Sequence, residues 1–448
     1  MSVLTRASLV EYNLLPIGKG ADISKVIVDA YAKSGREAVC VLNVSEIERH
    51  YNIWKTHLPE VQVRYAVKCN MHPLLLRSLH LLGAGFDCAS PAEVRAALSA
   101  GCPPSKIIYA NPQKPKRSIE EAFRLNCNTF TFDSEHELLS MLESTPPGKV
   151  GRFVLRLLPP DESSSICRFG VKFGASPSEC YRLIRLCKHL GANLVGFSFH
   201  VGSGCGSVDS FRLAVQYMGE AAKFAKEQGF TLTVLNIGGG YMSKGAERHY
   251  DEPNRHAHIT PPSFEEIASA LREEINRIKV YFTNKSEDLE IMAEPGRFFA
   301  GDIMTLGTRI YGRRIIFDKI EDNSCLTEKE IMESGKASIN EVKYYVGDGV
   351  YGYYNAILFD HVVPHLRFTD KHGNRKELSG AHAGSSLNTS SIFGPTCDSL
   401  DCILKERKLP LLDVGDWVIT DAFGAYTYAA ATEFNGIPHV SVVCCIEE

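Results

Sequence analysis

The sequence predicts an α/β protein in which a (β/α)8 TIM-type barrel is followed by an all-β domain. Two observations favour the barrel: short β-rich runs alternate with helix-period segments, and polar residues recur at the ends of those runs. A third favours the second domain, because strand-like segments with few helices between them follow Gly301. We expect the barrel to span residues 44–304, and residues 1–43 and 305–448 to form a β-sandwich or β-barrel domain.

The barrel prediction rests on β-rich runs at residues 38–42, 63–67, 85–88, 107–110, 129–132, 153–157, 194–199, 232–237 and 289–293. Helical periodicity lies between them, for example at 180–190, 210–228 and 264–278. Strands that alternate with helices predict a parallel sheet, and about eight or nine such units favour a closed barrel over an open sheet.

The second domain is predicted from strand-like segments at residues 344–346, 356–359, 417–420, 425–431 and 440–445. The polar segments 318–340 and 369–390 are expected to be loops. The opening 40 residues precede the first barrel strand and could return to this domain.

The composition is that of a soluble globular protein, with 448 residues, 44% hydrophobic and 23% charged. The net charge of −4 argues against nucleic acid as the main partner. No apolar run approaches the roughly 20 residues of a membrane span, and residues 1–20 lack a signal-peptide core. We therefore expect a cytoplasmic protein.

The fourteen cysteines are scattered and include no CxxC pair, which favours reduced thiols and no metal site. His249, His256 and His258 lie in a polar insertion that is interpreted as a surface loop, with a metal site as the alternative.

Polar residues fall within or just past the predicted barrel strands, at one edge where active sites form. They are Lys68, Asp87, Asn111, Asp133, Arg156, His200, Gly238 to Gly240 and Glu294. Lys68 follows a short apolar strand, where a lysine can become an amine nucleophile toward an aldehyde. Taken alone, a solvated surface lysine is the better interpretation.

Gly238, Gly239 and Gly240 directly follow a strand, where backbone N–H groups can approach a phosphate closely. Ser203 could add a hydroxyl donor. A tight turn is the alternative for the glycines.

Glu294 and Arg297 could hold a ring nitrogen and a phosphate, or form a structural salt bridge. His200 could lie flat against a ring or be structural. Lysine, phosphate cradle, arginine and carboxylate on one rim together indicate a pyridoxal phosphate site suited to amino-acid decarboxylation.

Eight ordered motifs resemble those of the eukaryotic ornithine decarboxylases, a group of pyridoxal-phosphate-dependent decarboxylases with the alanine-racemase fold. They are YAVKCN (65–70), GFDCAS (85–90), SFHVGSG (198–204), NIGGG (236–240), EPGR (294–297), DGVYG (348–352), ILFDH (357–361) and GPTCD (394–398). The resemblance implies an alanine-racemase-type barrel with a C-terminal β domain, in a homodimer with shared active sites.

By this resemblance, Lys68 would hold the cofactor and Glu294 would bind its pyridine nitrogen. His200 would stack on the ring, with Asp87 and Arg156 at its polar edge. The phosphate would be bound by Ser203, Gly238, Gly239, Gly240, Arg297 and Tyr426.

The resemblance also implies which residues bind the substrate. Cys397 and Asp398 would come from the partner subunit, and Cys397 would return a proton to the α-carbon. Asp360 and Asp398 would receive the distal ammonium of a diamino acid.

The expected activity is decarboxylation of L-ornithine to putrescine and CO2, the entry step of polyamine synthesis. The alternatives are a lysine or dual lysine/ornithine decarboxylase, and a catalytically inactive regulator similar to antizyme inhibitor. Antizyme is a further candidate partner. Asp87, Pro295 and Cys397 are present, whereas such regulators lose residues of this kind.

The sequence departs from the family pattern at four places. Asn236 stands where Asp is usual, Phe359 replaces a common Tyr, and Gln113 replaces a Cys. The loop from Tyr241 to Pro262 is longer. None of these changes removes a group assigned to catalysis.

Overall fold

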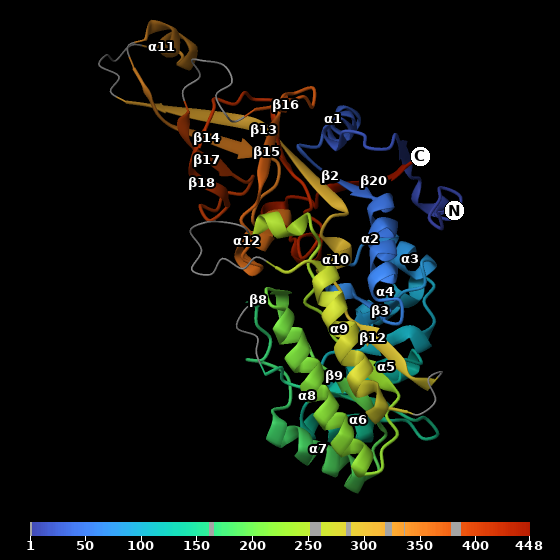
Figure 1. Ribbon diagram of the computed structural model, residues 1–448. Coiled ribbons are helices and arrows are strands. Elements are labelled where there is room, and N and C mark those ends of the chain that lie inside the picture. The colour runs from blue at the N-terminus through green and yellow to red at the C-terminus, as the bar shows by residue number, and fades with distance from the viewer. Residues whose placement is uncertain are drawn as a thin grey trace. The chain divides into compact units, whose positions relative to one another are not determined.

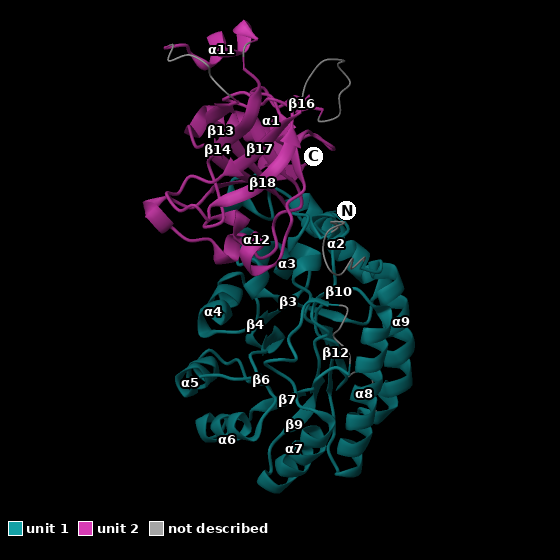
Figure 2. Ribbon diagram, turned by 90° about the vertical axis from the view of Figure 1, so that its left-hand side faces the viewer, with its two compact units in different colours: residues 1–14, 44–303 teal, residues 15–43, 304–448 magenta. Residues whose placement is uncertain are grey.

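The chain folds into two compact units (Figure 2). The barrel unit comprises Met1–Leu14 and Val44–Ile303, and the β unit comprises Leu15–Asn43 and Met304–Glu448. The computed structural model describes residues 2–160, 165–250, 261–283, 288–318, 325–335, 337–377 and 387–448. Residues 1–14 group with the barrel unit, whereas the sequence analysis expected the whole opening segment in the β domain.

Eight parallel strands close the barrel, which confirms the predicted fold class. In spatial order they are β3 (Gln62–Ala66), β4 (Gly85–Cys88), β5 (Ile107–Tyr109), β6 (Thr129–Phe132), β7 (Arg152–Arg156), β9 (Leu194–Ser198), β11 (Val234–Asn236) and β12 (Glu290–Ala293). Because all strands run the same way, their carboxyl ends meet at one rim.

Helices surround these strands (Figure 2). They are α2 (Val44–His57), α3 (Pro73–Leu81), α4 (Pro91–Ser99), α5 (Lys116–Arg124), α6 (Glu135–Ser144), α7 (Pro177–Leu190), α8 (Val208–Glu227), α9 (Phe264–Ile278) and α10 (Arg297–Ala300). Serine N-caps begin several of them; Ser90, for example, accepts a hydrogen bond from the N–H of Glu93 and starts α4 directly after the rim segment.

The β unit is built on a ten-stranded sheet, coloured from blue to red with chain position in Figure 1. Its strands are β1 (Leu15–Ile17), β2 (Ala38–Asn43), β13 (Met304–Phe317), β14 (Ile339–Val346), β15 (Leu366–Thr369), β16 (Arg375–Lys376), β17 (Asn388–Phe393), β18 (Cys402–Leu409), β19 (Trp417–Thr420) and β20 (Ser441–Glu447). Helix α1 (Ile23–Ser34) packs onto a core that includes Ile27, Val39 and Trp417.

Four local predictions in this unit were wrong. Residues 356–359 form a helical turn, α12 (Ala356–Phe359), because short apolar runs do not distinguish strand from helix. Residues 425–431 form no strand and contain a 3-10 turn at Tyr428–Ala430. Of the two segments expected to be polar loops, 318–340 contains α11 (Glu328–Ser334), which begins with a capping box made by Thr327 and Glu330. The other, 369–390, contains β16 and the start of β17.

Among the described residues, no helix is long and apolar enough to cross a membrane, and no group of three or more potential ligands could hold a metal ion. All fourteen cysteines are free thiols. His256 and His258 lie outside the described residues.

Candidate active site

The amine of Lys68 lies at the barrel rim, on the 3-10 turn Val67–Cys69 that follows β3. Its Nζ is 2.8 Å from Oδ2 of Asp87, in β4. The parallel register explains this contact, because Ala66 pairs with Asp87 across the two strands. Asp87 is buried and 41% of the Lys68 side chain is exposed, so the lysine neutralises a buried carboxylate while its amine stays accessible.

Glu294 follows β12 and is buried. Burial, with the negative charge of Asp87, raises its pKa to about 7, although Lys68, Asn236 and Arg156 act in the opposite direction. A carboxyl group with this pKa can hold or release a proton near neutral pH, which suits it to share one with a ring nitrogen.

Asn236, at the end of β11, ties Glu294 to the glycine turn. Its Nδ2 donates to Oε1 of Glu294 at 2.7 Å, and its Oδ1 accepts from the N–H of Gly238 at 2.9 Å. The N–H of Glu294 donates to the carbonyl of Gly238 at 2.7 Å. Because the backbone N–H requires the amide oxygen, the amide NH2 must face Glu294, which orients the carboxylate.

The glycine turn at Gly238 and Gly239 leaves no space for a side chain. Gly238 has a φ of +61°, and a Cβ there would lie 1.8 Å from the carbonyl oxygen of Phe199. A Cβ on Gly239 would lie 2.7 Å from Nε2 of His200. Only glycine fits at these positions, so the backbone of the turn approaches the His200 imidazole closely.

His200 is held as a neutral imidazole. Burial, together with the positive charges of Arg156 and Lys68, keeps its pKa well below the usual value. Its Nδ1 accepts from the N–H of Gly202 at 3.0 Å, and Phe169 packs edge-on against the ring at 4.8 Å. An uncharged, oriented imidazole suits stacking on an aromatic ligand.

Arg297 and Ser203 lie together beside the glycine turn. Nη2 of Arg297 donates to Oγ of Ser203 at 3.0 Å, and Nη1 donates to the hydroxyl of Tyr250 at 2.6 Å. All three side chains are buried. A guanidinium flanked by hydroxyls, next to glycine N–H groups, fits a phosphate dianion.

Two other residues that were predicted to lie at the rim, Asn111 and Asp133, form hydrogen bonds between the loops that follow the strands. Nε2 of Gln113 donates to Oδ1 of Asp133 at 3.1 Å, and Oδ2 of Asp133 accepts from the N–H of Gly174 at 2.8 Å. Asn111 accepts from the N–H of Gln113. These residues share the edge with Lys68 but link loops to one another.

The remaining predicted site residues belong to the β unit. Cys397 is exposed and Asp398 is half-buried, Asp360 is buried at the end of α12, and Tyr426 adopts a positive φ of 55°. The N–H of Leu400 and the hydroxyl of Tyr351 donate to Asp398 and lower its pKa. Asp398 is therefore an oriented anion.

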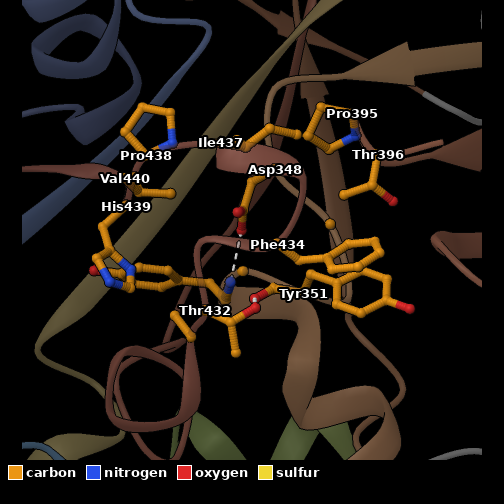
Figure 3. A pocket seen from close by; sticks show the side chains of 14 residues that line it. Asp348, Tyr351, Pro395, Thr396, Thr432, Phe434, Ile437, Pro438, His439 and Val440 are labelled. Atoms are coloured by element: carbon orange, nitrogen blue, oxygen red, sulfur yellow. Dashed lines mark hydrogen bonds between the residues drawn. The ribbon is translucent and has the colours of Figure 1, made fainter. Parts of the chain in front are cut away.

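Pro395 and Thr396, which directly precede Cys397, line a cavity of about 20 Å³ (Figure 3). Tyr351 stacks on Phe434 at 4.3 Å, and Asp348 accepts from the N–H of Tyr353 at 2.8 Å. Burial raises the pKa of Asp348 to about 7. The N–H of Cys397 donates to Asn435 at 3.1 Å, so these loops fix the backbone that carries Cys397 and Asp398.

Residues 44–301, more than half of the chain, match the family model described as pyridoxal-dependent decarboxylase, pyridoxal binding domain. The chain belongs to this family. Its cofactor is pyridoxal phosphate, and the glycine turn, the Arg297 and Ser203 donors and the buried Glu294 fit that group.

Known relatives of this decarboxylase-family chain include both enzymes and a protein named as a regulator. It is 36% identical over 417 residues to ornithine decarboxylase of Neurospora crassa, covering 91% of this chain and 80% of the relative. It is also 36% identical over 428 residues to antizyme inhibitor 2 of Xenopus laevis, covering 95% and 85% respectively.

Solved structures show the same fold. The arginine decarboxylase of Paramecium bursaria Chlorella virus superposes with a TM-score of 0.76 at 26% identity, covering 94% of this chain and 100% of that chain. The lysine/ornithine decarboxylase of Vibrio vulnificus, complexed with putrescine, has a TM-score of 0.72 at 26% identity and covers 95% and 98%.

Sequence reasoning missed three contributors. Asn236 was noted only as a departure, although its hydrogen bonds orient Glu294. Tyr250 sits in an insertion without a motif, and Asn435 carries no recognisable spacing signal. These roles depend on contacts between residues that are distant in sequence.

The raised pKa of Glu294 predicts how stability depends on pH in the cofactor-free protein. A carboxyl group whose pKa is about 7 when folded and near 4.5 when unfolded binds more protons in the folded state, so its destabilising effect grows as pH rises through that window. Glu294→Gln removes this effect. Its melting temperature relative to the natural protein should increase by about 3–5 °C between pH 5 and pH 8.

Differential scanning calorimetry of both proteins without cofactor measures this change. Glu273→Gln, an exposed substitution on α9, is the matched control and should show no such trend. A melting-temperature difference for Glu294→Gln that is independent of pH would show that Glu294 titrates as an ordinary carboxyl group.

Proposed function

We propose that this chain is a pyridoxal-phosphate-dependent decarboxylase that converts L-ornithine to putrescine and CO2. The observation that carries the proposal is the rim arrangement, in which the accessible amine of Lys68 pairs with Asp87 while Asn236 holds Glu294 beside the glycine turn. A nucleophilic amine and a carboxyl group for a pyridine nitrogen are the two protein groups that this cofactor chemistry needs.

In this proposal each barrel side chain has one task. Lys68 binds the cofactor aldehyde covalently, and Asp87 holds the lysine amine. Glu294 keeps a proton on the pyridine nitrogen, and His200 stacks on the ring with Arg156 at its polar edge. Bound pyridoxal phosphate supplies the electron-withdrawing ring that stabilises negative charge at the α-carbon.

The phosphate is assigned to backbone N–H groups and hydroxyl and guanidinium donors. They are Ser203, Gly238, Gly239, Gly240, Arg297 and Tyr426. The first five belong to the barrel unit and Tyr426 belongs to the β unit.

The substrate end is assigned to residues of the β unit. Asp360 and Asp398 receive the distal ammonium of the diamino acid, and the thiol of Cys397 returns a proton to the α-carbon. The lowered pKa of Asp398 supports this role, since an ammonium ion requires an ionised partner.

We propose that Cys397 and Asp398 act in the site of a partner subunit in a homodimer. Large exposed apolar side chains of the β unit support an interface: the exposed fraction is 68% for Leu400, two residues after Asp398, and 70% for Phe359 in α12. Exposed apolar groups of this size are typical of association surfaces. A cytoplasmic location and binding of antizyme belong to the same proposal.

A regulator without activity is the second candidate, and the identity to antizyme inhibitor 2 favours it. The presence of Lys68, Asp87 and Cys397 in their proposed roles supports the enzyme instead. A lysine or dual-specificity decarboxylase is the rival within the same chemistry, because the related lysine/ornithine decarboxylase of Vibrio vulnificus has been solved with cadaverine as well as with putrescine.

The kcat/KM of the purified, cofactor-loaded protein tests the substrate proposal. L-Ornithine should exceed L-lysine by about tenfold or more, since one methylene changes binding of a transition state by roughly 1–3 kcal/mol. Lys68→Ala, the control, should show no turnover. A preference for lysine would refute the substrate assignment, and bound cofactor without turnover of any diamino acid would identify a regulator.

Subunit mixing tests the shared site. Inactive Lys68→Ala and inactive Cys397→Ala subunits should recover about a quarter of full activity after random exchange, because half of the dimers then contain one intact site. Mixing Lys68→Ala with His200→Ala is the matched control: both changes affect the barrel rim, so no intact site can form. Absence of recovery in the first mixture, after exchange is verified by mass labelling, would rule out shared sites.

A further inference from the structure

The Tyr241 to Pro262 segment, longer than in the family pattern, brings one side chain to the rim that the proposed function does not use. Tyr250 follows the 3-10 turn Ala246–His249 and is 4% exposed. Its hydroxyl accepts from Nη1 of Arg297 at 2.6 Å, and its ring lies 5.3 Å from the Arg297 guanidinium carbon. Two different interactions therefore join Tyr250 to the arginine.

The turn that carries Tyr250 is anchored to the barrel. Asp302 accepts from Oγ of Ser243 at 2.6 Å and from the N–H of Gly245 at 3.1 Å, and Nε2 of His50 lies 3.3 Å away. Burial would raise the pKa of Asp302, but these bonds outweigh it and lower the pKa. Two hydrogen bonds from the segment to one ionised carboxylate, which His50 of α2 also contacts, fix the turn, so Tyr250 is positioned before any ligand arrives.

The direction of the hydrogen bonds shows how the hydroxyl group of Tyr250 is used toward Arg297. A guanidinium can only donate, so the oxygens of Tyr250 and Ser203 are both acceptors toward Arg297. Neither contact uses the hydroxyl proton of the acceptor. Arg297 thus orients two hydroxyl groups whose protons can be donated to an anion beside the glycine turn.

We propose that Tyr250 is a phosphate-binding and positioning residue of the cofactor site, supplied by the extended segment. It holds the Arg297 guanidinium by its ring and oxygen, and its hydroxyl proton is donated to a phosphate oxygen. The inference rests on the phosphate role of Arg297 under the proposed function.

Paired ligands separate a phosphate role from a purely structural one. Pyridoxal phosphate and pyridoxal differ only in the phosphate group. The dissociation constant of pyridoxal divided by that of pyridoxal phosphate therefore measures how much the phosphate contributes to binding. The proteins are cofactor-free natural chain, Tyr250→Phe, Tyr250→Leu and Arg297→Lys. Tyr241→Phe is the matched control, because it removes a buried phenol hydroxyl from the same segment that donates to the carbonyl of Ile237 at 3.4 Å.

Equilibrium dialysis measures both dissociation constants for each protein. Tyr250→Phe should weaken pyridoxal phosphate about tenfold, the effect of losing a hydrogen bond to a charged group, and leave pyridoxal unchanged. Tyr250→Leu should weaken it further, and Tyr241→Phe should change neither constant.

An unchanged ratio in Tyr250→Phe, or an equal weakening of both ligands, would overturn the assignment. Arg297→Lys separates this failure from that of the proposed function. If its ratio also stays unchanged, the phosphate site itself is wrongly placed; if its ratio falls, only the role of Tyr250 is wrong.

Discussion

The ion pair between Lys68 and Asp87 is the interaction on which the site depends. Neighbouring parallel strands place the two residues side by side, and the buried carboxylate is stable only because a cation is adjacent. Glu294 is affected by the same charges: Asp87 raises its pKa and Lys68 lowers it. A change at Lys68 therefore removes the cation beside the buried Asp87 and alters the pKa of Glu294, as well as removing the nucleophile.

Asn236 contacts Glu294 without adding a charge to this group of ionisable side chains. An Asp at this position, the residue usual in the family, would place another carboxylate against Glu294, and one of the two would need a proton. The amide satisfies the N–H of Gly238 and donates to Glu294 without adding charge. One neutral side chain thereby fixes both the Glu294 carboxyl group and the glycine turn.

The fold could be predicted from periodicity because each barrel strand is short, apolar and followed by a helical segment. The grouping of the candidate site residues followed from the same pattern, since parallel strands bring Lys68, Asp87 and Glu294 to one rim. The partners of those residues could not be predicted. The contacts of Asn236 with Glu294 and of Tyr250 with Arg297 join segments about 50 residues apart, and no local pattern encodes them. Likewise, the apolar run at α12 gave no signal of its helical turn.

The most direct test of the account is chemical identification of the lysine that carries the cofactor. The loaded protein is reduced with borohydride, digested and analysed by mass spectrometry to locate the phosphopyridoxyl group. We expect the label on Lys68 alone, and no label in Lys68→Ala. A label on another lysine in the natural protein, such as Lys114, or no label in protein shown to bind the cofactor, would contradict the site described above.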